Sequence, residues 1–194
     1  MDARGRRPAS GGTTAGGTAA ADGTAAAPST PMRVVGVDPG LANIGLGAIE
    51  EVRPGARLLG SELITTSPRA PQPERLLQVR AAFHAFVATH RPDAIAIEGQ
   101  YFHRQRDVAF RVGQAVGVVL LTAAEAGLPV FEYGPMQVKR ALVGTGKADK
   151  AQVAYMVRAL LTLPSTPTSN HVADALALAL THLQSRRIGQ LTSD

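Results

Sequence analysis

Residues 33–66 read RVVGVDPGLANIGLGAIEEVRPGARLLGSELITT, which is three apolar or alternating runs separated by Gly and Pro. Runs of this kind, bounded by turn residues, predict three short β-strands. Because the connections between them are short, the strands are expected to pair as an antiparallel meander. Asp38 ends the first run, so the pattern places a carboxylate at the end of the first predicted strand.

Two further strands are predicted downstream. DAIAIE (residues 93–98) is a short apolar run followed by Gly99, which is typical of a strand buried on both faces. PVFEY (residues 129–133) reads as a fifth strand.

Helices are predicted between and after these strands. The segment 73–90 and the segment from about Asp107 to Ala126 carry apolar residues at helical spacing. The apolar positions are Leu76, Val79, Phe83, Phe86 and Val87 in the first segment, and Val112, Val116, Val119 and Leu120 in the second. Further helices are predicted over 135–144, over 148–163 and from Asn170 to about Ser185. The whole order predicts an α/β fold with a mixed five-stranded sheet flanked by helices.

The ends of the chain differ from this core. Residues 1–31 contain no Leu, Ile, Val or aromatic residue, so they cannot bury enough apolar surface to offset the entropy of ordering. We therefore expect a disordered N-terminal tail over 1–31, a folded domain over 32–185 and a flexible C-terminal tail over 186–194. Met32 directly precedes the first predicted strand and is a candidate translation start.

Composition excludes several classes of protein. The chain has no cysteine, which excludes disulfides and thiolate metal sites, so a bound metal must use carboxylate, imidazole or carbonyl groups. No apolar run reaches the roughly 18 residues of a membrane span, and the N-terminal region lacks the apolar segment of a secretory signal. These features predict a soluble cytoplasmic protein with no membrane partner.

The charge favours a polyanionic partner over a basic surface that serves only solubility. The net charge is +5 and the pI is about 10.2. All three lysines fall between Lys139 and Lys150, and further basic residues follow Glu98. Clusters of this kind suit a phosphate backbone that must be drawn to an acidic site. The nucleic-acid candidates in these clusters are Arg104, Arg106, Lys139, Arg140, Lys147 and Lys150.

Four potential metal ligands stand where the predicted elements begin or end. Asp38 and Glu98 each close an apolar strand, and His171 and Asp174 lie one turn apart at the start of the last helix. If the two strands are neighbours and the helix packs beside them, the four side chains converge. A carboxylate at the end of a buried strand needs a cation or a metal as its partner.

The expected metal chemistry is that of phosphodiester hydrolysis. Two divalent ions about 4 Å apart can activate the attacking water and stabilise the leaving oxygen. Oxygen ligands suit Mg²⁺, so two Mg²⁺ ions per site are expected. Imidazole is more readily accepted by Mn²⁺, so His171 either shifts the preference to Mn²⁺ or takes part in proton transfer.

Longer motifs carry a family resemblance. Four motifs together resemble the Holliday-junction resolvase family RuvC. They are DPGLANIGLGAI (38–49), AIEGQYF (96–102), the run 113–164 that begins GQAVGVVLL and ends LLTLP, and ADALALALTH (173–182). The resemblance extends from Met32 to about Ser185. It implies an RNase H-like fold and a homodimer that cuts a four-way DNA junction symmetrically with Mg²⁺ or Mn²⁺, leaving 5′-phosphate and 3′-hydroxyl ends. It also implies RuvA and RuvB as partners.

The resemblance assigns roles to single residues. It implies that Asp38, Glu98 and Asp174 are catalytic metal ligands, whereas His171 stands where many members have aspartate. It also implies that Tyr101 stacks on a base near the junction point, with Phe102 as a second wedge. Lys139 and Lys150 match positions that support DNA binding and catalysis.

Other functions stay open at this stage. An RNA–DNA hybrid nuclease or a RuvX-like nuclease would use the same kind of metal-binding carboxylates. A non-catalytic junction-binding protein would have the same basic clusters. A Walker loop is excluded, because GTGK (144–147) would need Gly at Ala141 and Ser or Thr at Ala148.

Overall fold

A mixed five-stranded sheet forms the centre of the computed structural model, which describes residues 31–40, 42–99 and 106–191. The strands are β1 (Arg33–Asp38), β2 (Asn43–Val52), β3 (Gly55–Thr65), β4 (Ala94–Glu98) and β5 (Val130–Tyr133). The strand order is β3-β2-β1-β4-β5. β1, β2 and β3 pair antiparallel, and β4 pairs parallel with both β1 and β5. The predicted meander and the predicted mixed sheet are therefore confirmed.

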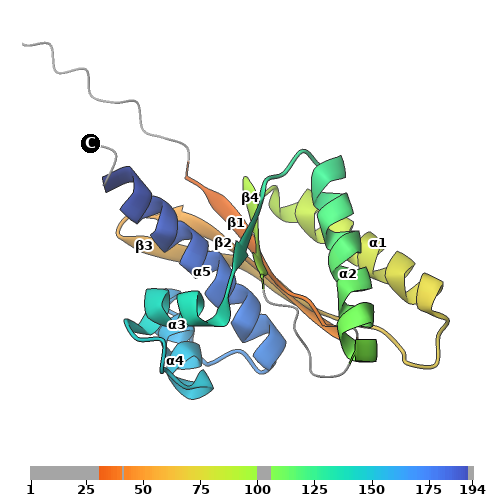
Figure 1. Cartoon of the computed structure of the whole chain (residues 1–194). Helices are drawn as coiled ribbons and strands as arrows, with labels where there is room; N and C mark the ends of the chain where they lie inside the picture. Colours follow the sequence, from red (N-terminus) through yellow and green to blue (C-terminus); the bar gives the residue numbers. More distant parts are fainter. Residues whose placement is uncertain (1–30, 41, 100–105, 192–194) are drawn as a thin grey trace, which may run out of the picture. The chain divides into compact units, whose positions relative to one another are not determined.

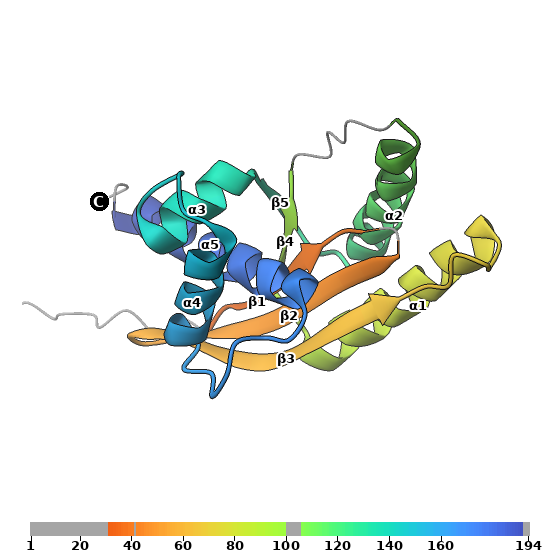
Figure 2. The ribbon, with the colours of Figure 1, turned by 90° about the horizontal axis from the view of Figure 1, so that it is seen from below.

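Helices cover both faces of this sheet (Figures 1 and 2). α1 (Gln72–His90) and α2 (Arg106–Glu125) pack on one face. α3 (Pro135–Val143), α4 (Lys150–Leu160) and α5 (Asn170–Leu191) belong to the opposite face. Only the backbone is described for residues 106–108 and 189–191.

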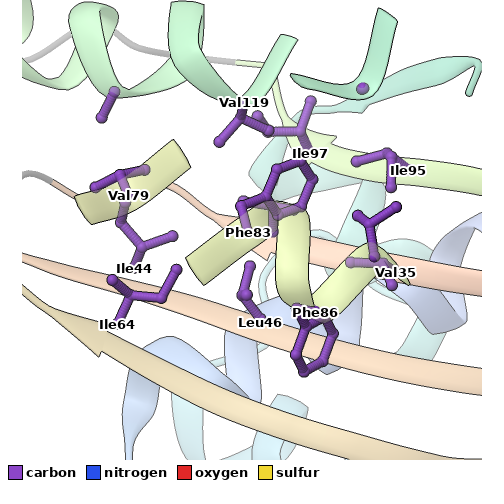
Figure 3. Packing of buried hydrophobic residues seen from close by; sticks show 14 of the residues in the cluster. Val35, Ile44, Leu46, Ile64, Val79, Phe83, Phe86, Ile95, Ile97 and Val119 are labelled. Carbon is purple, nitrogen blue, oxygen red and sulfur yellow. The ribbon is translucent and has the colours of Figure 1, made fainter. Parts of the chain in front are cut away.

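The core on the α1 and α2 side is built from the predicted apolar stripes (Figure 3). Phe83 is fully buried at 0% exposure, and Val112, Val116 and Val119 are also buried. Burial of one such side chain stabilises the fold by about 1.5–3 kcal/mol. Leu120 was wrongly predicted to belong to the stripe. It is 37% exposed, because its neighbour Val119 takes the inward position and consecutive helical residues point about 100° apart.

α5 lies almost in backbone contact with the other face of the sheet. Gly36 on β1 faces this helix, and a Cβ atom placed there would overlap the carbonyl oxygen of Ala175. A Cβ atom at Gly47 on β2 would meet the side chain of Leu176 at 2.5 Å. These glycines therefore let the helix approach more closely than any larger residue would allow.

The ends of the predicted elements need one correction. α5 continues to Leu191, so the predicted end near Ser185 was wrong and residues 186–191 are helical. Arg187 anchors this extension, since its guanidinium donates to Glu51 Oε1 at 2.9 Å and to the carbonyl oxygen of Gly55 at 2.9 Å. The predicted tail over 1–31 lies outside the described residues except for Pro31, as do residues 192–194.

Within the described ranges, the structure contains no helix with the length and hydropathy that a membrane crossing requires.

Candidate active site

Two of the predicted ligands, Asp38 and Glu98, lie side by side at the carboxyl ends of two neighbouring strands in the middle of the sheet. β1 and β4 are parallel neighbours, and the paired residues Val37 and Ile97 directly precede Asp38 and Glu98. The carboxyl ends of both strands therefore bring these two side chains to the same point, on the face that α5 covers. The prediction that these two strands are neighbours in the sheet is confirmed.

The first turn of α5 brings His171 to Asp38. Asp38 pairs with Gly45 across β1 and β2, and a Cβ atom at Gly45 would overlap the carbonyl group of His171. Because Gly45 has no side chain, the helix start can rest on the sheet beside Asp38. His171 Nδ1 lies 2.6 Å from Asp38 Oδ2, within hydrogen-bond distance.

A single pocket collects all four predicted ligands. It has a volume of about 580 Å³, and Asp38, Glu98, His171 and Asp174 all line it. Lys139 of α3 and Lys150 of α4 line it as well.

The start of α4 positions Lys150 at this pocket. Asp149 caps the helix, since its carboxylate accepts from the backbone N–H of Gln152 at 2.8 Å. Lys150 is the first residue of the helix, and its Nζ lies 3.5 Å from Asp174 Oδ2.

Burial and mutual repulsion make the carboxylates costly to ionise. Burial raises the pKa of Asp38, although the hydrogen bond from His171 opposes the rise. Burial also raises the pKa of Glu98, and the charges of Asp38 and Asp174 raise it further. Nearby negative charges that repel one another in a pocket are relieved by a bound cation, so the site has the electrostatics of a metal-binding site.

The donor set fits a hard divalent cation in its chemistry. Among the described residues, no group of three or more His, Asp or Glu side chains is arranged to hold an ion as the side chains stand. As the side chains stand, Asp38 Oδ2 is in contact with His171 and Asp174 Oδ2 with Lys150.

The predicted nucleic-acid residues separate into three groups. Lys139 and Lys150 line the pocket. Arg140 and Lys147 are exposed and lie outside its lining. Tyr101, Phe102, Arg104 and the side chain of Arg106 lie outside what the structure describes.

Tyr133 is a pocket residue that sequence reasoning did not identify. It lines the pocket, and it stands directly opposite Glu98 in the pairing of β4 with β5. The available signal was its place at the end of the short strand PVFEY, but the strand order that puts β5 beside β4 could not be inferred from the pattern alone.

Comparisons with known proteins agree on one family. The family model described as crossover junction endodeoxyribonuclease RuvC matches residues 34–182. The chain is 48% identical over 161 residues to a crossover junction endodeoxyribonuclease RuvC of Thermus thermophilus, covering 81% of this chain and 97% of the relative. It is 46% identical over 153 residues to that of Roseiflexus sp., covering 79% and 91% respectively.

Solved structures give the same result. The structure titled T. thermophilus RuvC in complex with Holliday junction substrate superposes with a TM-score of 0.78 at 48% identity, covering 81% of this chain and 96% of that chain. The yeast mitochondrial Holliday junction resolvase shares the fold at a TM-score of 0.60 and 13% identity, covering 81% of this chain and 80% of that chain.

Proposed function

Because the chain belongs to the RuvC family of crossover junction endodeoxyribonucleases, we propose that it resolves Holliday junctions by paired nicks that depend on a divalent metal. The observation that carries the proposal is the meeting of Asp38, Glu98, His171 and Asp174 in one pocket, from segments far apart in the chain. Junction resolution serves homologous recombination and DNA repair, and we place the protein in the cytoplasm with the DNA.

The carboxylates of Asp38, Glu98 and Asp174 would hold the metal. A bound divalent ion, Mg²⁺ or Mn²⁺ and two per site as the resemblance implies, would supply an activated water and stabilise the leaving oxygen. Lys139 and Lys150 line the same pocket and supply positive charge for the scissile phosphate.

His171 completes the set in one of two ways. Its ring lies against Asp38, so it either donates a ring nitrogen to the metal or orients the Asp38 carboxylate and accepts a proton there. The exposed cations Arg140 and Lys147 extend the binding surface along the DNA backbone. Tyr101 and Phe102, with Arg104 and Arg106, are proposed to contact bases and phosphates near the junction point.

A homodimer is proposed through the outer face of α2. Phe110 is 69% exposed and Leu121 is 56% exposed on this helix. Gly113 and Gly117 lie between them, with nothing within 4 Å of a Cβ atom placed at either glycine. The spacing puts the four residues on one face, so a second copy could approach closely. RuvA and RuvB are the further partners that the resemblance implies.

The test is cleavage of a synthetic mobile four-way junction by the wild-type chain, with Mg²⁺ and Mn²⁺ compared. We expect symmetric nicks in opposing strands, and we expect Asp38→Asn to reduce cutting to background while still binding the junction. Glu62→Gln, which changes an exposed carboxylate on β3, is the matched control and should cut normally. Cutting of an RNA–DNA hybrid but not of the junction would overturn the proposal.

A further inference from the structure

The pocket has a second wall that metal binding does not explain. Besides the ligands and lysines, its lining includes Tyr133 on β5, Val138 on α3, Val153 on α4 and Leu178 on α5. None of these side chains is charged. The volume of about 580 Å³ falls in the range of about 300–1,000 Å³ that takes drug-sized ligands, so the pocket has room for a whole nucleotide.

Tyr133 places an aromatic ring beside the proposed catalytic carboxylates. Its partner in the parallel pairing of β4 and β5 is Glu98, and paired residues of neighbouring strands direct their side chains to the same face. The backbone N–H of Gly99 donates to the carbonyl oxygen of Tyr133 at 3.1 Å, which fixes the two strand ends together.

The ring of Tyr133 is held by its own hydroxyl group. Tyr133 Oη lies 2.8 Å from Nδ1 of His182, which is only 4% exposed. The ring of Phe131 packs on His182 with the ring centroids 4.4 Å apart. Because the hydroxyl is engaged with His182 on α5, Tyr133 has its ring rather than a free hydroxyl group to offer to a ligand in the pocket.

We propose that this wall is a subsite for one nucleobase of the cleaved strand, next to the scissile phosphate, with Tyr133 as its stacking platform and His182 as the residue that positions the platform. The inference rests on the proposed junction-cutting function. The pocket combines the two chemistries that a nucleotide needs. Asp38 and Glu98, through a bound cation, and Lys150 would take the phosphate, while the uncharged wall with the Tyr133 ring would take the base.

A double-mutant cycle tests the proposal, in which one change is made at Tyr133 and the other is the removal of a base from the DNA. Wild type, Tyr133→Leu and Tyr133→Phe are compared on intact junctions and on junctions with an abasic nucleotide on either side of the scissile phosphate. Tyr155→Leu is the matched control, because Tyr155 is 64% exposed on α4 and lies outside the pocket lining. Cleavage is measured at saturating enzyme, and circular dichroism checks the folding of each variant.

We expect the abasic nucleotide at one of the two positions to slow wild type about tenfold or more. In Tyr133→Leu the intact junction should be cut at a similarly reduced rate, and the abasic nucleotide should cause no further loss. Tyr133→Phe keeps the ring, so it should keep most of the sensitivity to the missing base, and Tyr155→Leu should behave as wild type.

Two outcomes would overturn the subsite. One is an equal loss from the abasic nucleotide in wild type and in Tyr133→Leu, and the other is no loss at either position in wild type. Failure of the wild-type chain to cut the intact junction would instead overturn the proposed function. Because the comparison of intact and abasic junctions in wild type needs no variant, the absence of any loss there overturns the subsite even if a variant is misfolded.

Discussion

His171 differs chemically from the three carboxylates with which it shares the pocket. Its Nδ1 lies 2.6 Å from Asp38 Oδ2, and its side chain is 42% exposed while that of Asp38 is 13% exposed. The imidazole is therefore the more solvent-accessible member of this pair. We therefore propose that His171 influences which metal the site accepts.

Replacement of His171 should change the cleavage rate with Mg²⁺ and the cleavage rate with Mn²⁺ to different extents. We expect His171→Ala to slow junction cleavage about 10- to 100-fold, because Asp38 loses the group that orients it. His171→Asp adds an oxygen ligand and should restore activity with Mg²⁺ more than with Mn²⁺. The measurement is the cleavage rate across a titration of each metal. Wild-type rates for His171→Ala with both metals would show that the ring has no part in the site.

A second residue-scale feature lies away from the pocket, on β2. Glu50 is 6% exposed and stands opposite Arg33 on β1 and Arg57 on β3. Arg33 Nε donates to Glu50 Oε1 at 2.9 Å, and Arg57 forms an ion pair with the other oxygen. The hydrogen bonds from Arg33 and Arg57 lower the pKa of Glu50 below its ordinary value of 4.5.

Glu50→Gln should therefore destabilise the fold in a pH-dependent way. We expect a loss of about 1–2 kcal/mol in the free energy of unfolding at neutral pH, since both guanidinium groups stay partly exposed. A lowered pKa gives stability that is present above the unfolded pKa and is lost as the pH falls through the folded one. The gap between wild type and variant should thus be constant above about pH 5 and shrink below about pH 4.5.

Urea unfolding at a series of pH values measures this gap, with the exposed Glu62→Gln as the control. A gap that is unchanged from neutral to strongly acidic pH would mean that packing, rather than charge, holds Glu50.

At the scale of elements, the close packing of α5 against the sheet determines the geometry of the site. The helix carries His171 and Asp174, and it rests on Gly36 and Gly45 through its own backbone carbonyl groups. Backbone atoms cannot move aside as a flexible side chain can. A methyl group at either glycine must therefore push the whole helix away from β1 and β2.

Gly36→Ala should accordingly damage both stability and activity. We expect a loss of about 3 kcal/mol or more in the free energy of unfolding, at the upper end of the range for overpacked cores. Gly55→Ala is the matched control, because a Cβ atom there would meet only the carbonyl oxygen of Leu160 at 4.0 Å. Chemical denaturation together with the cleavage rate measures the effect. Near wild-type stability in Gly36→Ala would contradict the close seating of α5.

Most elements were predictable because their patterns are local. The strands Arg33–Asp38 and Ala94–Glu98 are apolar runs bounded by turn residues, and their parallel pairing placed Asp38 beside Glu98 as expected. The end of α5 was not predictable, because Arg187 in its last part is held by tertiary contacts with Glu51 and Gly55. The pairing of His171 with Asp38 and the role of Tyr133 also depend on how distant segments pack, which no local pattern encodes.

At the scale of the whole molecule, the proposed dimer contact through the exposed face of α2 can be tested. We expect Leu121→Glu to convert the proposed dimer into a monomer, because a buried unpaired charge at an interface is strongly unfavourable. Light scattering after gel filtration measures the mass. A cruciform plasmid measures the consequence, since a monomer should leave single nicks where a dimer gives linear products.

Leu77→Glu is the control for this experiment, because Leu77 is 66% exposed on α1 and lies outside the proposed contact face. A dimer that persists in Leu121→Glu would place the subunit contact elsewhere.

The order in which the pocket is assembled along the chain has a consequence during synthesis. Asp38 is made early, Glu98 later, and His171 and Asp174 arrive only with α5, the last helix of the fold. A nascent chain on the ribosome, or a product truncated before α5, therefore lacks two of the four proposed ligands and also the helix that packs on β1 and β2. On the proposed site assignment, nuclease competence therefore arises only after α5 has been synthesised.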